Sequence, residues 1–301
     1  MRRVAAVDIG TNSTRLLVAD VEDEVVHELD RRLEITRLGE GVDERRILLP
    51  QAIARVRNVL ADYRLGVEEA GAERALAFAT SAVRDAENGE AFLGEVEWGY
   101  GFKTQLATGD EEALLTRRGV QPPPGTLVLD IGGGSTELVL DDFHVSLPMG
   151  AVRFTERWGE HRAAIEEATT ELLTEHANVH PRAAIGVAGT VTTLAALDLG
   201  LEEYDRDRVD GYLLTRRAAQ SQLHRLAALP LEERRQVPAL EPERAPVIVA
   251  GAAILVATLA YFGLNTITAS EHDILDGIAL AAADLPAPDG GDAPPGAFTC
   301  C

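Results

Sequence analysis

The stretch DIGTNSTRLLV at residues 8–18 decides the fold, because a near copy, DIGGGSTELVL, recurs at residues 130–140. Each copy lies between two runs of strand-forming residues, so each glycine-rich turn is predicted to close a β-hairpin. Walker and dinucleotide-binding loops differ, because they open a helix. The repeat therefore predicts a duplicated hairpin unit, one copy in each half of the chain.

The residue types of both turns suit phosphate binding. Small residues with permissive dihedral angles let backbone N–H groups converge on an anion, and hydroxyls add further donors. The candidate phosphate-binding residues are Gly10, Thr11, Asn12 and Ser13 in the first turn and Gly132, Gly133, Gly134, Ser135 and Thr136 in the second. One such turn alone would be read as a Gly-Ser hairpin with a capping aspartate. Repetition at matched positions favours the phosphate interpretation.

An aspartate ends the strand before each turn, at Asp8 and Asp130. A carboxylate there would repel a phosphate group unless a cation lay between them. Mg²⁺ prefers such oxygen ligands and often keeps part of its water shell. Both aspartates are therefore predicted to contact Mg²⁺, directly or through water.

Five further motifs accompany the turns: RLGEGV (37–42), ATSAVRDA (79–86), GDEEA (109–113), VAGTVTTL (187–194) and ERAPVIVAG (243–251). In this order the chain resembles the Ppx/GppA phosphatases, which are exopolyphosphatases and guanosine pentaphosphate phosphohydrolases. That family is part of the superfamily of acetate and sugar kinases, heat-shock chaperones and actin. The resemblance covers residues 4 to about 284. One departure is SEHDILDG (270–277), where many relatives have Gly-Leu-Arg before an acidic residue and the glycine.

The resemblance implies an α/β fold of two ribonuclease H-like (actin-like ATPase) domains. Each would be a mixed sheet with helices on both faces, with the active site in the interdomain cleft. The stiff segment QPPPG at residues 121–125 marks the boundary. The expected domains are residues 1–121 and 122–285, followed by a disordered tail over residues 286–301, which is rich in Pro, Gly and Asp.

The resemblance also implies roles for particular residues. Glu112 resembles the family's catalytic base that activates the attacking water, and Glu137 matches its second active-site glutamate, where the first turn has Arg15. Arg84 matches an arginine near the phosphates. Taken without the resemblance, Glu112 could be an acidic residue suited to a helix N-terminus, and Arg84 an ordinary salt-bridge partner. Gly189 and Thr190 match a turn that approaches adenosine in nucleotide-binding relatives and is expected here to bind phosphate.

The 301-residue chain has a formal net charge of −21, which argues against nonspecific binding to nucleic acid or an anionic membrane. Local arginines and Mg²⁺ must then offset the repulsion of a polyanionic substrate. Three arginine pairs, at residues 45–46, 117–118 and 216–217, could line a phosphate path or be solvated surface features. The uncharged segment from Ala245 to Leu264 is predicted to be a buried helix rather than a membrane span.

The only cysteines, Cys300 and Cys301, give no disulfide framework, and the N-terminus has no signal-peptide pattern, so a cytoplasmic protein is expected. The predicted activity is release of terminal orthophosphate from inorganic polyphosphate by Mg²⁺-assisted attack of water, by an exopolyphosphatase. Longer family members carry a C-terminal HD-type domain; without it, short chains or guanosine pentaphosphate are plausible substrates. A homodimer is a further expectation. Readings from other classes are a kinase and a nonenzymatic polyphosphate or nucleotide sensor.

Overall fold

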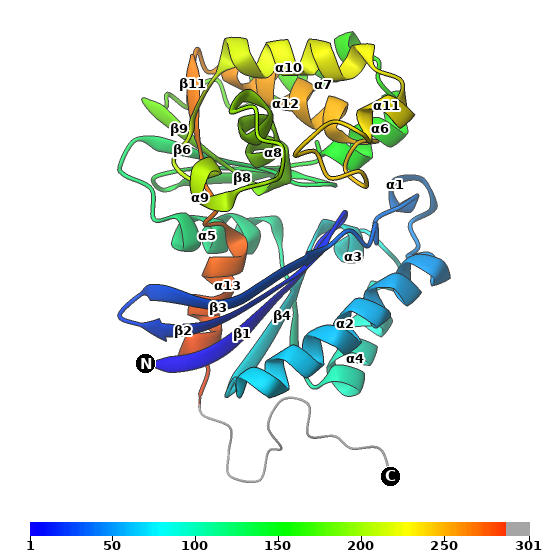
Figure 1. Ribbon diagram of the computed structural model, residues 1–301, viewed down its shortest axis with the longest axis vertical. Coiled ribbons are helices and arrows are strands. Elements are labelled where there is room, and N and C mark those ends of the chain that lie inside the picture. Colours follow the sequence, from blue (N-terminus) through cyan, green and yellow to red (C-terminus); the bar gives the residue numbers. More distant parts are fainter. Residues whose placement is uncertain (287–301) are drawn as a thin grey trace. The chain divides into compact units, whose positions relative to one another are not determined.

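The computed structural model describes residues 1–286 and divides the chain into two compact units (Figure 1). Unit 1 contains Met1–Val120 together with the segment that begins at Ile274, and unit 2 contains Gln121–Asp273. Each unit is a mixed β-sheet with helices packed against it. The predicted α/β class is therefore confirmed.

Unit 1 is built on a five-stranded sheet of order β3-β2-β1-β4-β5. Its strands are β1 (Arg2–Ile9), β2 (Thr14–Glu22), β3 (Val25–Glu34), β4 (Arg74–Ala79) and β5 (Lys103–Leu106). Its helices are α1 (Val42–Arg45), α2 (Pro50–Ala70), α3 (Ser81–Arg84), α4 (Gly89–Tyr100), α5 (Gly109–Val120) and α13 (Ile274–Asp284). β1 pairs antiparallel with β2 and parallel with β4.

Unit 2 is built on a six-stranded sheet of order β10-β11-β9-β6-β7-β8. Its strands are β6 (Thr126–Ile131), β7 (Thr136–Leu140), β8 (Phe143–Leu147), β9 (Ala183–Val187), β10 (Leu213–Thr215) and β11 (Thr266–Ala269). Its helices are α6 (Ala151–Trp158), α7 (Arg162–Thr174), α8 (Ala188–Asp198), α9 (Arg206–Val209), α10 (Arg216–Ala228), α11 (Leu231–Arg234) and α12 (Ile248–Tyr261).

The duplication predicted from the two turns is present in the topology. β1 and β2 form the first hairpin, and β6 and β7 form the second. The sheet order β3-β2-β1-β4-β5 of unit 1 is matched by β8-β7-β6-β9-β11 in unit 2, where β10 is added at the edge. In both units the strand before the glycine-rich turn lies at the centre of the sheet. Because β1 and β6 are buried, each turn is held in a fixed position.

The last helix, α13, corrects the predicted domain boundary. Residues 122–285 were expected to form the second domain, but α13 packs against β1, β2 and β4 of unit 1. Its apolar residues form one core with the strand residues Val4, Ala6, Leu17, Leu76 and Phe78. The opposite face of that sheet is covered by α2 and α4. Without α13 one face of the sheet would be bare. Apart from Pro286, the predicted tail lies outside the described residues.

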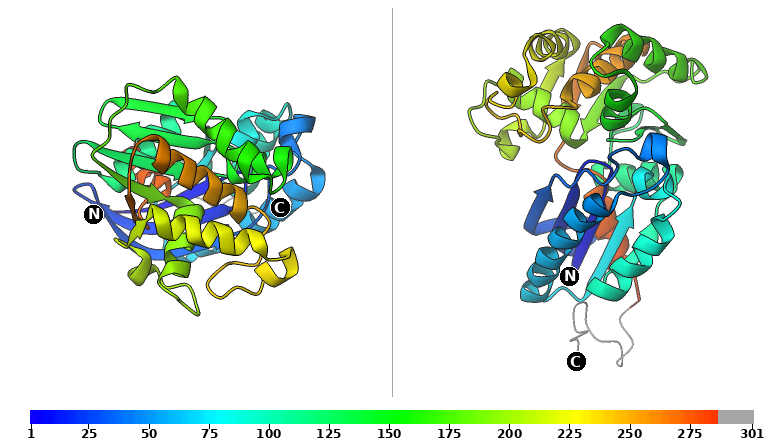
Figure 2. Two further views of the ribbon diagram at one scale, coloured as in Figure 1. Left: turned by 90° about the horizontal axis from the view of Figure 1, so that it is seen from above. Right: turned by 90° about the vertical axis from the view of Figure 1, so that its right-hand side faces the viewer.

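Helix α12 is the buried helix predicted from the uncharged segment. Every residue from Ile248 to Leu259 is buried, as expected for a helix that is apolar all round. It lies beside α10 and α7, which are yellow and green next to the orange α12 in Figure 2. Among residues 1–286, none of the helices combines the length and the apolar character needed to cross a bilayer.

A truncation test follows from the return of α13 to unit 1. We expect a chain ending at Asp273 to lose the cooperative unfolding of unit 1, because the side chains of Ile274, Leu275, Ile278 and Leu280 are almost fully buried. Burying such a side chain contributes about 1.5–3 kcal/mol, so four approach the whole stability of a domain. Thermal unfolding followed by circular dichroism measures this. The control ends at Pro286, and equal melting curves for the two chains would contradict the expectation.

Candidate active site

The first turn is held in shape by hydrogen bonds to its own backbone and to the segment that follows β3. The N–H of Gly10 donates to the carbonyl of Ser13 at 2.9 Å, and the N–H of Gly39 donates to Thr11 O at 2.9 Å. A Cβ atom at residue 39 would lie only 2.2 Å from Cγ2 of Thr11. Gly39, in the RLGEGV motif, is therefore required for this close approach.

A chain of polar contacts leads from the first turn to the predicted base. The hydroxyls of Thr11 and Ser81 lie 2.8 Å apart, which joins the turn to α3. Arg84 at the end of α3 forms an ion pair with Glu112 and also donates to the carbonyl of Ala107 at 2.6 Å. Glu112 is only 5% exposed. Three residues predicted from separate motifs, Thr11, Arg84 and Glu112, are thus connected within unit 1.

The neighbouring glutamate has a different role. Glu111 accepts hydrogen bonds from the N–H and the hydroxyl of Thr108, at 2.8 and 2.9 Å, while Thr108 Oγ1 accepts from the N–H of Glu111 at 3.2 Å. This reciprocal pattern is a capping box at the start of α5. Glu111 therefore fixes the helix N-terminus, and Glu112 is the buried carboxylate that Arg84 contacts.

The second turn is supported in a similar way by α6. The N–H groups of Ala151 and Val152 donate to the carbonyls of Gly132 and Gly133, at 2.9 and 2.8 Å. Arg153 adds a bond from Nε to Gly134 O at 2.6 Å. A Cβ atom at Gly150 would lie 2.4 Å from the carbonyl oxygen of Gly133. Gly150 therefore does for the second turn what Gly39 does for the first. Gly150 and Arg153 had not been singled out from the sequence.

The two hairpins share a register but differ in charge. Asp8 lies opposite Arg15 and Asp130 lies opposite Glu137. Arg15 Nη2 is 2.7 Å from Asp8 Oδ2. In the second hairpin both members of the pair are carboxylates, 8% and 3% exposed, and Glu137 accepts a hydrogen bond from the hydroxyl of Ser146 at 2.7 Å. Like charges directly opposite one another are destabilising in a sheet, so this pair favours a cation.

This donor set fits Mg²⁺ better in the second hairpin than in the first. No group of three or more His, Cys, Asp or Glu side chains suited to a metal occurs among residues 1–286. Mg²⁺ is commonly held by one or two carboxylates, with phosphate oxygens and water completing its shell. Asp130 and Glu137 supply two such carboxylates, whereas the Asp8 carboxylate is already paired with a guanidinium.

The start of α8 holds Gly189 and Thr190. A Cβ atom at Gly189 would lie 1.5 Å from Nη1 of Arg244, so the guanidinium lies directly over the backbone of this helix end. Arg244 is in turn 3.2 Å from the Glu241 carboxylate. The ERAPVIVAG motif had contributed only to the resemblance. The arginine in it is the cationic side chain that this helix N-terminus places beside Gly189.

Some predicted residues are committed to the fold. Thr136 is fully buried and its hydroxyl donates to Met149 O at 2.6 Å, so its side chain stabilises the hairpin. Arg118 forms ion pairs with Glu24 and Asp284, at 2.7 and 2.8 Å. The hydrogen bond from Arg118 lowers the pKa of Glu24. These contacts give Arg118 a structural role inside unit 1 rather than a place on a phosphate path.

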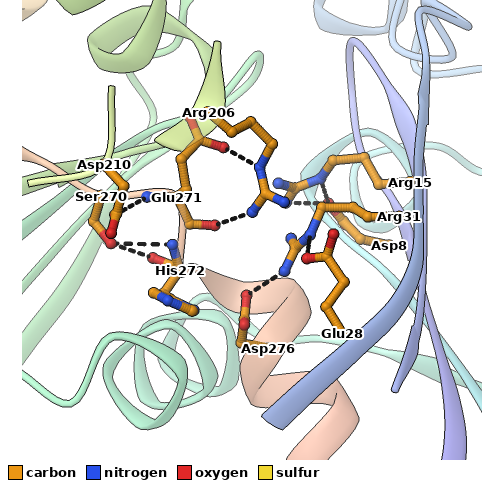
Figure 3. Close-up of polar contacts among 10 residues, drawn as sticks. All are labelled: Asp8, Arg15, Glu28, Arg31, Arg206, Asp210, Ser270, Glu271, His272 and Asp276. Carbon is orange, nitrogen blue, oxygen red and sulfur yellow. Dashed lines mark hydrogen bonds and ion pairs between the residues drawn. The ribbon is translucent and has the colours of Figure 1, made fainter. Parts of the chain in front are cut away.

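The departing segment, residues 270–277, is also firmly held (Figure 3). Glu271 is contacted by Arg206 Nε at 2.9 Å and by the hydroxyl of Tyr204, and its N–H donates to Asp210. Burial and the Glu271 carboxylate raise the pKa of Tyr204 above its ordinary value, so the phenol remains the donor. In unit 1, Arg31 joins Glu28 on β3 to the buried Asp276 on α13.

Comparison with known proteins agrees with this geometry. The family model described as "Ppx/GppA phosphatase family" matches residues 17–284. Exopolyphosphatase 2 of Mycobacterium tuberculosis is 36% identical over 317 residues, covering 94% of this chain and 99% of the relative. The chain belongs to the Ppx/GppA phosphatase family, and it is an enzyme of the hydrolase class.

Solved structures extend the similarity to the fold. A crystal structure of an exopolyphosphatase-like protein matches with a TM-score of 0.85 and 33% identity, covering 92% of this chain and 98% of the other. The Aquifex aeolicus PPX-GPPA enzyme matches with a TM-score of 0.79 and 31% identity, covering 93% of this chain and 99% of the other. Both similarities cover almost the whole chain, so the two-unit, actin-like architecture is the family's own.

Proposed function

We propose that this protein is an exopolyphosphatase, which removes terminal orthophosphate from inorganic polyphosphate. The observation that carries the proposal is the buried Glu112, which Arg84 connects to the first phosphate turn through α3. A binding protein would need the turns and the arginines but no buried carboxylate placed beside them. The name of the M. tuberculosis relative supports polyphosphate as the substrate.

In this proposal each unit contributes defined groups. The N–H groups and hydroxyls of the two turns bind phosphate oxygens, together with the N-terminal turn of α8 at Gly189 and Thr190. Glu112 accepts a proton from the water that attacks the terminal phosphorus. The oxygen of that water forms the new P–O bond as the bridging phosphoanhydride P–O bond breaks. Arg84 holds the Glu112 carboxylate and faces the phosphate with its guanidinium.

Asp130 and Glu137 would hold Mg²⁺, which when bound neutralises charge on phosphate oxygens. Their opposed positions on β6 and β7 bring two oxygen donors together. Asp8, predicted as an equivalent ligand, instead orients Arg15 beside the first turn. The two aspartates of the repeat are therefore proposed to have different roles.

The second candidate activity is removal of the 5′-terminal phosphate of guanosine pentaphosphate. It is favoured by the start of α8, where Arg244 lies over Gly189 and Tyr204 lies close enough for Arg244 to affect its titration. A cation and an aromatic ring could contact a nucleotide at that place. Both candidates use the same turns and the same base, so only the group beyond the first phosphates differs.

The deciding experiment measures orthophosphate release from short polyphosphate, long polyphosphate, guanosine pentaphosphate and ATP under one set of conditions. We expect the highest kcat/KM with polyphosphate. A higher kcat/KM with guanosine pentaphosphate would select the second activity. Binding of polyphosphate without release from any of the four substrates would establish a sensor instead of a hydrolase.

The assignment of the base is tested by Glu112→Gln. The amide keeps the size of the side chain but cannot accept the proton, so kcat should fall by roughly 10²- to 10⁴-fold. Glu111→Gln is the matched control, because glutamine preserves the capping box and kcat should stay within about twofold. If the Glu111 variant were the inactive one, or both remained active, Glu112 would not be the base.

The unequal roles of the two aspartates give a second test. Asp130→Asn should raise the Mg²⁺ concentration for half-maximal activity by at least about tenfold, because one of two metal-binding carboxylates is lost. Asp8→Asn should mainly lower thermal stability, by about 3 kcal/mol, since it breaks a buried ion pair. Magnesium titrations and melting curves of both variants are compared. An unchanged titration curve for Asp130→Asn, or activity in excess chelator, would refute this division.

A further inference from the structure

Helix α5, which carries Glu112, packs chiefly against α13. The two backbones meet at Gly277, where a Cβ atom would lie 2.0 Å from the carbonyl oxygen of Leu115 and 2.6 Å from its carbonyl carbon. Any side chain at this position would require the two helices to separate by about 1 Å, because carbon and oxygen do not approach below about 3 Å without bonding. Only glycine permits this contact.

The other contacts of α13 prevent it from yielding. Asp276, which is 1% exposed, is held by Arg31 Nη2 at 3.0 Å (Figure 3). The apolar residues of α13 are buried against β1, β2 and β4. Added volume at Gly277 would therefore move α5, whose Leu114 is half exposed and which has no sheet behind it within unit 1.

Leu115 lies three residues after Glu112, so the contact with α13 is less than one helical turn from the carboxylate. The partner of Glu112, Arg84, is on α3 and does not belong to the moving helix. α3 stays with the first turn through the contact between Ser81 and Thr11. Displacing α5 would therefore move Glu112 relative to both Arg84 and the bound phosphate.

We propose that Gly277 is a positioning residue for the hydrolysis, because its missing side chain sets the distance between α13 and α5 and hence the place of Glu112. The inference rests on the proposed role of Glu112. It assigns a function to the glycine that closes the SEHDILDG segment. Gly277 acts through α5 and does not itself touch the substrate.

The test is Gly277→Ala, assayed for kcat and KM with short polyphosphate. A misplacement of about 1 Å lowers kcat by roughly 10²-fold, and KM should stay within about twofold because the phosphate turns are unchanged. Gly94→Ala is the control for the chemical change, since a Cβ atom there meets nothing within 4 Å. Ile278→Val is the control for weakened packing on α13, because it removes a buried methylene without adding volume. Both controls should keep kcat.

A double-mutant cycle separates positioning from general damage. In the Glu112→Gln background, Gly277→Ala should cause less than about a twofold further loss of kcat, because the group it displaces has already lost its function. An equal fractional loss in both backgrounds would overturn the inference, as would normal kcat in Gly277→Ala. If Glu112→Gln alone keeps full activity, the proposed base is wrong, and the cycle shows this separately.

A second variant keeps the inference testable if Gly277→Ala does not fold. Arg31→Lys loosens the anchor of α13 without adding volume, because lysine cannot reproduce the two-sided guanidinium contacts with Glu28 and Asp276. It should lower kcat a few-fold, with KM unchanged, and only in the presence of Glu112. Equal losses with and without Glu112 would again refute the positioning role.

Discussion

The packing of α13 against unit 1 is the constraint on which the rest of the structure depends. One face of the sheet formed by β1, β2 and β4 is covered by this helix, which the chain reaches only after traversing unit 2. The core of unit 1 therefore closes through contacts between residues more than 250 positions apart, such as Val4 and Ile278. Such non-local closure costs entropy before it contributes stability. Unit 1 and the helix that supports its predicted base are consequently completed last.

The repeated hairpins show how one scaffold can hold two different charge arrangements. The sheet order and the hydrogen bond that closes each turn, from Gly10 to Ser13 and from Gly132 to Ser135, are the same. The supporting segments differ in type, since an extended loop carries Gly39 whereas a helix follows Gly150. The decisive difference is a single cross-strand position, occupied by Arg15 in one copy and Glu137 in the other. That exchange changes an ion pair into a pair of carboxylates.

The hairpins and the duplicated sheets were predictable because a turn is specified by its own residues and repeated patterns imply repeated structure. The destination of α13 was not, since its sequence shows which residues are apolar but not which sheet they cover. The equal treatment of Asp8 and Asp130 failed for a similar reason. The partner of a carboxylate is set by strand register, and register became certain only in the structure. Glu111 and Glu112 were told apart from the sequence by resemblance, and the capping box now gives a physical reason.

Charge balance explains why a cation is needed in addition to the arginines. Arg15, Arg84 and Arg244 each contact a carboxylate, on Asp8, Glu112 and Glu241 respectively. These pairs orient the guanidinium groups, but they leave little net positive charge at the turns, and the chain as a whole carries −21. A phosphate chain adds several negative charges in a small volume. Hydrogen bonds from backbone N–H groups stabilise it only in part, because they contribute dipoles and no whole charge. A divalent cation held by Asp130 and Glu137 would supply the missing charge, which makes the like-charged pair in the second hairpin a requirement of the chemistry rather than a defect of the sheet.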